Sequence, residues 1–234
     1  MQIICFYSRK SLSLQSFWNE IVFKIMDYLS FREKLLPLGC FNIKQINMFY
    51  PNYDVNNITR WVKNGYLVKL KRGWYVFSEC LHDRDISLMI ANQITTPSYL
   101  SLHFALAYYG MIPETIVQMT SVTTQKTARY ENTTGIYTYQ TINPKLFFGY
   151  HPIPVTSKHI HGRTYMMATP EKALLDLLYL HTEYQTEEDF LQLRLDEDYL
   201  LYELNQTRLN EYLQRWNSPQ LNKRVKILLN AYHI

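Results

Sequence analysis

The chain has 234 residues, of which 47% are hydrophobic and 15% are aromatic, and its formal net charge is +4. This composition supports packed cores and excludes a disordered polypeptide, while the length allows one large or two small domains. Residues 1–80 hold eleven of the 24 Lys and Arg but five of the 20 Asp and Glu. The basic first part and the slightly acidic remainder are therefore expected to do different jobs.

Cys5, Cys40 and Cys80 are few and far apart, so neither a disulfide framework nor a zinc cluster is expected, and a reducing cytoplasm fits best. Charges interrupt every apolar run in residues 1–25 below membrane-spanning length, and the segment lacks the order of a secretory signal. We therefore expect no membrane segment and interpret residues 1–25 as an N-terminal extension that forms an extra helix. Alternatively, Met26 is the true start, because MDYLSFREKLL opens the next module directly.

Residues 26–80 predict three short helices and a hairpin. The first helix is expected over residues 31–38. The second begins at Asn42 and turns three apolar side chains inward: Ile43, Ile46 and Phe49. Pro51-Asn52-Tyr53 then forms the turn to the third helix.

The third helix is predicted over residues 55–63, with Asp54 as its N-cap and Asn64-Gly65 as its left-handed stop. Its apolar side chains recur at helical spacing and form one stripe: Val55, Ile58, Trp61 and Val62. The opposite face is polar and consists of Asn56, Asn57, Thr59, Arg60 and Lys63. Such a face suits base edges, because Asn can bond adenine, Arg and Lys can bond guanine, and the Thr methyl can contact a thymine methyl.

A basic β-hairpin is predicted directly after this helix. Its first strand alternates two sets of side chains: Tyr66, Val68 and Leu70 on one face, and Leu67, Lys69 and Lys71 on the other. Arg72-Gly73 makes the turn, and residues 74–77 return as the second strand. Lys69, Lys71 and Arg72 are thus expected near the hairpin tip, where phosphates are usually met.

Together these elements predict a winged helix-turn-helix domain that binds double-stranded DNA. Residues 54–77 contain five basic side chains against Asp54 alone, a local concentration that groove binding requires. The predicted DNA-binding residues are Asn56, Asn57, Thr59, Arg60, Lys63, Lys69, Lys71 and Arg72. Arg60 is expected to read a base and Lys71 to contact phosphate. The alternatives are a helix and hairpin with merely solvated charges, or a hairpin that docks a protein.

Residues 81–234 predict a mixed α/β domain with C-terminal helices, which makes the whole chain α+β. Two helices are expected first, over residues 85–94 and 99–109. Strands are expected at residues 114–124, 135–142, 146–150 and 163–167. Thr169 and Pro170 then mark the start of a helix that covers the sheet. Four further helices are expected over residues 187–195, 198–204, 208–216 and 219–231.

Three segments carry a family resemblance: NITRWVKNGYLVKLKRGWYVF, PSYLSLHFALAYYGMIPETIVQMTSVTT and ATPEKALLDLLYL. In this order they resemble the AbiEi-type transcriptional regulators, antitoxins of bacterial type IV toxin-antitoxin systems that act in phage abortive infection. The likeness spans about residues 30–180. It implies a winged helix that binds inverted repeats in its own promoter. It also implies a C-terminal domain that counteracts a nucleotidyltransferase-type toxin without a stable complex.

Residue by residue, the resemblance places the family's DNA-contacting helix on Asn56, Asn57, Arg60 and Lys63. It places the family's wing on Lys69, Lys71, Arg72 and Gly73. The antitoxin surface is carried over to no particular side chain.

A metal-dependent nuclease targeted by the winged helix is the runner-up. Glu171 and Lys172 would combine with nearby carboxylates to bind Mg²⁺, the candidates being Asp83, Asp85, Glu114 and Asp176. The simpler interpretation is that Glu171 stabilises a helix N-terminus, Lys172 reaches solvent, and Asp176 pairs with it one turn away. We therefore predict a protein that is not an enzyme and needs no cofactor.

Two weaker signals remain in the second domain. His159 and His161, with His151, have a spacing that can hold a metal on a strand, but Gly162 and the lack of a companion carboxylate or Cys favour ordinary histidines. We predict no metal site. Residues 183–203 contain eight acidic side chains against Arg194 alone. This acidic run is either a solvated face or a surface that meets a basic partner such as the toxin.

Overall fold

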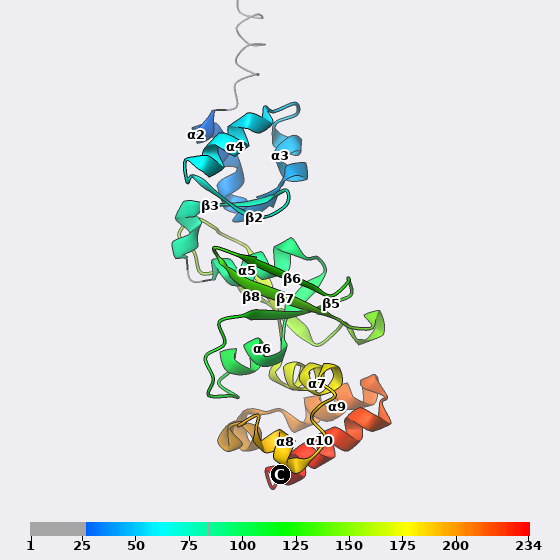
Figure 1. The fold of residues 1–234 in the computed structure, drawn as a ribbon. Helices are drawn as coiled ribbons and strands as arrows, with labels where there is room; N and C mark the ends of the chain where they lie inside the picture. Colours follow the sequence, from blue (N-terminus) through cyan, green and yellow to red (C-terminus); the bar gives the residue numbers. More distant parts are fainter. Residues whose placement is uncertain (1–26, 84) are drawn as a thin grey trace, which may run out of the picture.

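A computed structural model describes residues 27–83 and 85–234 of the chain. Three parts are stacked end to end: a small N-terminal part, a six-stranded mixed sheet with helices, and a group of C-terminal helices (Figure 1). The predicted α+β class is confirmed. Residues 1–25, which were interpreted as an extra helix, lie outside the described residues. Met26, the alternative start, does so too.

The N-terminal part combines three short helices with a three-stranded antiparallel sheet of order β1-β3-β2. Its elements in chain order are α2 (Tyr28–Leu35), the 3₁₀ turn η1 (Leu36–Leu38), β1 (Cys40–Asn42), α3 (Ile43–Phe49), α4 (Val55–Lys63), β2 (Leu67–Lys71), β3 (Trp74–Phe77) and the 3₁₀ turn η2 (Ser78–His82). The prediction of one helix over residues 31–38 was wrong at both ends. Asp27 caps α2 earlier, and Pro37, which has no N–H to donate, lies in a separate turn.

Aromatic side chains fill the core of this N-terminal part. Phe31, on α2, lies with its ring centroid 4.7 Å from that of Trp61 and 5.6 Å from that of Phe41. Phe77 packs against the same ring, so one side chain joins α2 to α4 and to two strands of the sheet. Rings packed at these separations add to the stability that burial alone provides.

Cys40 and Cys80 are also buried here and are both free thiols. Burial raises the pKa of each thiol to about 12, which keeps both protonated and unreactive at neutral pH.

The second part is built on a sheet of order β6-β7-β5-β4-β9-β8. Its elements in chain order are α5 (Ile86–Ile94), β4 (Ser98–Leu100), α6 (Leu102–Tyr108), β5 (Met119–Thr123), β6 (Ala128–Asn132), β7 (Gly135–Thr141), the 3₁₀ turn η3 (Pro144–Leu146), β8 (Tyr150–Pro154) and β9 (Thr164–Ala168). The pairs β5/β7 and β4/β9 are parallel, whereas β4/β5, β6/β7 and β8/β9 are antiparallel. The sheet is therefore mixed.

Three sequence predictions for this sheet need correction. The helix expected over residues 99–109 starts only at Leu102, because residues 98–100 are a fully buried strand too short to show a period of its own. The strand expected at residues 146–150 lies instead at residues 150–154. β6 was not expected. Its side chains alternate between half-buried and exposed, so this strand has no fully buried face that an apolar pattern could have indicated.

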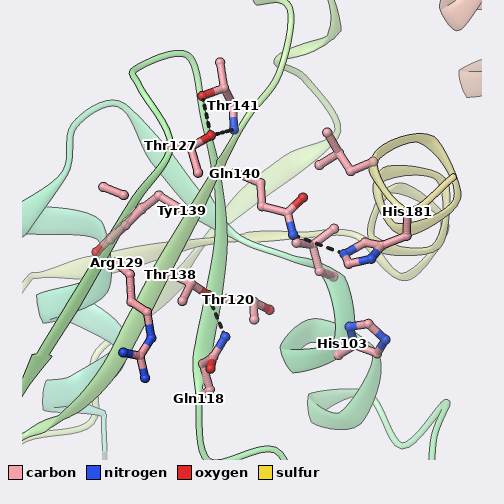
Figure 2. Close-up of a pocket in the computed structure, with 13 residues that line it drawn as sticks. His103, Gln118, Thr120, Thr127, Arg129, Thr138, Tyr139, Gln140, Thr141 and His181 are labelled. Atoms are coloured by element: carbon pink, nitrogen blue, oxygen red, sulfur yellow. Dashed lines mark hydrogen bonds between the residues drawn. The ribbon is translucent and has the colours of Figure 1, made fainter. Parts of the chain in front are cut away.

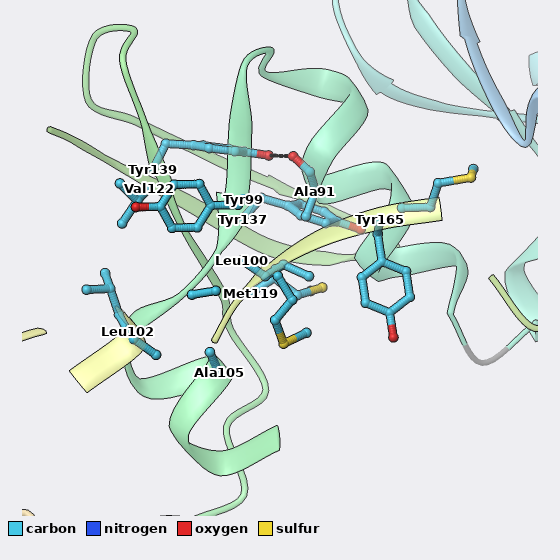
Figure 3. Packing of buried hydrophobic residues seen from close by; sticks show 14 of the residues in the cluster. Ala91, Tyr99, Leu100, Leu102, Ala105, Met119, Val122, Tyr137, Tyr139 and Tyr165 are labelled. Atoms are coloured by element: carbon cyan, nitrogen blue, oxygen red, sulfur yellow. Dashed lines mark hydrogen bonds between the residues drawn. The ribbon is translucent and has the colours of Figure 1, made fainter. Parts of the chain in front are cut away.

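Helices cover both faces of the sheet, with α5 toward the N-terminal part and α6 and α7 (Pro170–Leu180) toward the C-terminus (Figure 1). On the α7 side, Gln140 of β7 lies beside His181, which directly follows α7 (Figure 2). On the α5 side, the buried Tyr139 hydroxyl donates to the carbonyl of Ala91 at 2.6 Å (Figure 3). The sheet is thus tied by hydrogen bonds to the helices on both faces.

The C-terminal helices are α8 (Glu187–Leu191), the single π turn η4 (Tyr199–Glu203), α9 (Gln206–Trp216) and α10 (Pro219–Ala231). Among them, α9 and α10 pack on α7, and α8 packs on α10. The predicted start of α7 is confirmed, because Pro170 is its first residue and the Thr169 hydroxyl accepts from the backbone N–H of Lys172 at 3.3 Å. Across residues 27–83 and 85–234, every helix falls short of the length and apolar character that crossing a bilayer demands.

A fully buried polar network joins α7 to the sheet. The Lys172 ammonium pairs with the Asp176 carboxylate and also donates to the Tyr99 hydroxyl at 2.7 Å. Asp176 accepts from Tyr99 at 2.9 Å and from Ser101 at 2.8 Å. Burial lowers the pKa of Lys172 and raises the pKa of Asp176, and the attraction between the two opposes both shifts.

The prediction that Lys172 reaches solvent was wrong. Because the sheet and α6 cover one side of α7 while α9 and α10 cover the other, both of its faces are buried. The Lys172 ammonium lies 4.3 Å from the centre of the Trp216 ring of α9, so its charge meets an aromatic face instead of water.

We predict that Lys172→Met lowers the free energy of unfolding by about 3–5 kcal/mol, because Asp176 then stays buried without its cation. The double variant Lys172→Met/Asp176→Asn should recover most of the loss, since a neutral amide still bonds to Tyr99 and Ser101. Urea denaturation measures both. The exposed Lys226→Met is the matched control and should be nearly neutral. A Lys172→Met variant as stable as this control would contradict the role given to the ion pair.

Candidate nucleic-acid interface

The helix α4, predicted as the DNA-reading helix, has the bounds and caps that the sequence indicated. The Asp54 carboxylate accepts from the backbone N–H of Asn56 at 2.9 Å, and Gly65 after the helix has a φ of +75°. Ile58 and Trp61 are buried as predicted, but Val55 is 64% exposed. The predicted apolar stripe is therefore too long, because the first turn of α4 projects beyond the core.

The polar face of α4 is open to solvent. Asn56, Thr59, Arg60 and Lys63 are exposed, and Asn57 is half-buried. The Asn57 side-chain oxygen accepts from the Arg60 guanidinium at 2.8 Å. This bond orients Arg60 along the helix and leaves most of its five donors free.

The hairpin departs from the strict alternation that the sequence suggested. β2 and β3 pair Lys69 with Tyr75 and then Lys71 with Trp74, so Leu70 is an extra residue in the ladder. Leu67 and Leu70 are both buried for this reason. The expectation of one basic face on β2 was therefore wrong, since the bulge separates Lys69 from Lys71.

Lys71 contacts the second part of the molecule. Its ammonium donates to the carbonyl of Ile94 and lies 4.6 Å from the centre of the Tyr130 ring. Lys71 was predicted to bind phosphate, but its ammonium group contacts Ile94 and Tyr130 of the second part. The candidate interface therefore does not include Lys71. Lys69 and Arg72 remain exposed on the same hairpin.

Further contacts fix the N-terminal part on the sheet domain. The Asn132 amide of β6 donates to the carbonyl of Leu70 at 3.0 Å. Met89 of α5 packs so closely on Gly39 that a Cβ there would meet its methyl carbon at 2.0 Å. Gly39 has a φ of +72°, so both its backbone conformation and its neighbour require a residue without a side chain.

The hairpin turn also rests against the helix α3. The carbonyl of Gly73 accepts from the backbone N–H of Ile43 at 3.0 Å. Ile46 is buried as predicted, but Ile43 and Phe49 are each 40% exposed. The prediction that all three turn inward was therefore wrong for two of them, because this short helix reaches the core at its centre only.

Each of the carboxylates considered for a nuclease is bonded to a structural partner of its own. Asp85 accepts from the backbone N–H of Thr156, Glu114 pairs with Arg194, and Glu171 accepts from the backbone N–H of Asn205. His159 and His161 lie in the loop between β8 and β9 and not on a strand. Within the described residues, nowhere do three or more His, Cys, Asp or Glu side chains gather in a way that suits a metal ion.

Sequence reasoning missed one collection of polar side chains, at His103 and His181. These residues are far apart in the chain, yet their ring centroids lie 5.5 Å apart in the fold. Neither a motif nor a regular spacing links them, so only the packing of α6 against α7 could have identified the pair.

Comparison with protein families finds no family model that matches this chain, and comparison with curated proteins finds no significant match.

We predict that Lys71→Met lowers the free energy of unfolding by about 1–3 kcal/mol, because it removes a charged hydrogen bond between the two parts. Lys69→Met, on the same strand but exposed, should change stability by less than about 0.5 kcal/mol. Thermal and urea unfolding of the two variants provide the comparison. Equal effects would show that Lys71 does not join the two parts.

Proposed function

We propose that the N-terminal part is a winged helix-turn-helix that binds double-stranded DNA. The order α2-β1-α3-α4-β2-β3 and the sheet β1-β3-β2 support this assignment, with α4 as the recognition helix and the β2–β3 hairpin as the wing. The single observation that carries the proposal is the exposed polar face of α4, which presents Asn56, Arg60 and Lys63 while its apolar side is held in the core.

The proposed interface divides base recognition from phosphate contact. Arg60 and the two asparagines of α4 have the side chains that bond base edges in the major groove. Lys69 and Arg72 are exposed on the wing, which packs directly after α4, and they supply charge for the backbone. Thr59 completes the polar face, although its hydroxyl already donates to the carbonyl of Val55 at 3.3 Å.

We further propose that the chain is an autoregulator and antitoxin. It binds inverted repeats in its own promoter and counteracts a nucleotidyltransferase-type toxin, as its resemblance to the AbiEi-type regulators implies. Support for a partner surface comes from residues 187–203, where exposed acidic side chains and exposed apolar ones are interspersed along the chain. The exposed apolar residues are Leu191, Leu201 and Tyr202.

Not every acidic residue of this run is free for a partner. Asp189 forms the capping box of α8 with Thr186, and Glu183 bonds to His181 at 2.7 Å. Glu187 and Glu188 are exposed and form no ion pair with the described residues. We therefore assign contact with a basic partner to Glu187 and Glu188.

We predict that Arg60→Ala weakens binding to the promoter by about 1–3 kcal/mol and relaxes the choice of sequence, because a base contact is lost. Lys69→Ala should weaken specific and random DNA alike and reduce the slope of the salt dependence by about one. Gel-shift titrations across salt concentrations with upstream and scrambled DNA measure both effects.

Lys226→Ala, on the distant helix α10, is the matched control and should bind DNA normally. If Arg60→Ala affects random and promoter DNA equally, α4 does not read sequence, and the recognition-helix assignment fails.

We predict that co-expression of this chain restores growth to cells that express the neighbouring nucleotidyltransferase gene. Glu187→Lys/Glu188→Lys should abolish this protection while promoter binding persists, because the charge of the partner surface is reversed. Glu131→Lys/Glu211→Lys makes the same change of charge at exposed positions elsewhere and should still protect. If both double variants lose protection, the overall charge of the protein, and not a defined surface at Glu187 and Glu188, would explain the neutralisation of the toxin.

A further inference from the structure

A hollow of about 660 Å³ lies on the α7 side of the sheet (Figure 2). This side faces away from the N-terminal part, which carries the proposed DNA interface (Figure 1). Strands β5, β6 and β7 form one wall, and the start of α6 and the end of α7 form the other. Its size falls within the range of sites that hold small organic ligands.

The lining of this hollow is rich in hydrogen-bond donors. Two imidazoles, two side-chain amides and a guanidinium converge on it: His103, His181, Gln118, Gln140 and Arg129. Threonine hydroxyls from the strands lie between them, and no carboxylate lines the hollow. Such a set of donors without an acidic side chain favours an anion.

The histidines at one end are held differently from each other. His181 contacts Glu183 through Nδ1 at 2.7 Å and the Gln140 amide nitrogen through Nε2 at 3.1 Å. Because an amide nitrogen only donates, Nε2 of His181 accepts and Nδ1 carries the proton. The ring nitrogens of His103 bond to none of the described residues, so this imidazole is free to meet a ligand.

The charges around His103 set its response to an anion. Burial is the largest cause that lowers the pKa of His103, and proximity to His181, whose protonation would repel a second cation, is the next, while Glu183 and Glu114 act in the opposite direction. The ring is therefore mainly neutral at neutral pH. An anion beside it raises its pKa, so binding takes up a proton and becomes tighter as the pH falls.

The backbone that presents His103 is strained. Leu102, immediately before it, is buried and has a φ of +59°, a conformation that residues with a side chain rarely adopt. It turns the chain sharply from β4 into α6 and sets His103 in the first turn of that helix. Strain of this kind is found preferentially at functional sites.

Arg129 supplies the permanent charge at the other end. It pairs with Glu131 at 2.9 Å, but both side chains are more than half exposed, so solvent competes with this bond. The guanidinium keeps further donors for a ligand, and a fork of donors matches the oxygens of a phosphate.

We propose that the hollow binds a small organic phosphate of about the size of a nucleoside monophosphate. His103 and Arg129 contact the phosphate, and the amides of Gln118 and Gln140 contact polar groups of the organic part. The amide nitrogen of Gln118 donates to Thr138 at 2.9 Å, which holds that side chain in place and leaves its oxygen to accept. The proposal does not depend on the proposed DNA binding.

The test is isothermal titration of the full chain at pH 6 and pH 8. The probes are AMP, GMP, CMP, UMP and ribose 5-phosphate, with adenosine and inorganic phosphate as separate arms. At least one organic phosphate should bind about tenfold more tightly than adenosine and than inorganic phosphate, and more tightly at pH 6 than at pH 8. If none of the organic phosphates binds at millimolar concentration, or if inorganic phosphate binds equally well, the proposal fails.

Paired variants assign the binding to the hollow. Arg129→Gln and His103→Asn should each weaken it about tenfold, and His103→Asn should also reduce the gain in affinity from pH 8 to pH 6. Lys226→Gln and His151→Asn, at exposed positions outside the lining of the hollow, are the matched controls and should bind like the unchanged chain. Circular dichroism verifies that His103→Asn folds, and Arg129→Gln tests the same site at an exposed position. Unchanged binding by both variants would overturn the assignment.

Discussion

The packing of the sheet, α7 and the C-terminal helices depends on one interaction, the buried ion pair between Lys172 and Asp176. A charge without access to water is tolerated only with a partner and hydrogen bonds, and here Tyr99, Ser101 and the Trp216 ring complete the set. These partners come from β4, the turn after it and α9, so one network orients the sheet, α7 and the C-terminal helices. It also holds one wall of the donor-rich hollow, the wall formed by α6 and α7, because Ser101 directly precedes α6 and α7 ends beside that hollow.

Much of the fold could be predicted from local signals. Asp54 and Thr169 cap their helices as expected because capping is decided by a few neighbouring residues. The predictions failed where the environment decides the outcome. Leu70 is buried because β2 contains a bulge, which the alternating sequence does not reveal. Lys172 is buried because a distant helix covers it, and no property of its own segment indicates this.

The two candidate sites differ in the same way. The polar face of α4 is contiguous in sequence and follows helical periodicity, so its residues could be named in advance. Lys71 could not be separated from Lys69 by composition, since its carbonyl partner at Ile94 belongs to another part of the fold. The hollow could not be predicted at all, because its walls come from segments that only the sheet order brings together.

Stacking the parts end to end separates opposite charges along the molecule. Residues 27–80 contain eight Lys and Arg against four Asp and Glu, while residues 181–234 contain six against nine. The contacts of Leu70 and Lys71 with the sheet domain hold the two regions apart at opposite ends (Figure 1). The protein is therefore an electric dipole. In the field of a polyanion it experiences a torque that turns the N-terminal end forward before contact, and added salt weakens this alignment.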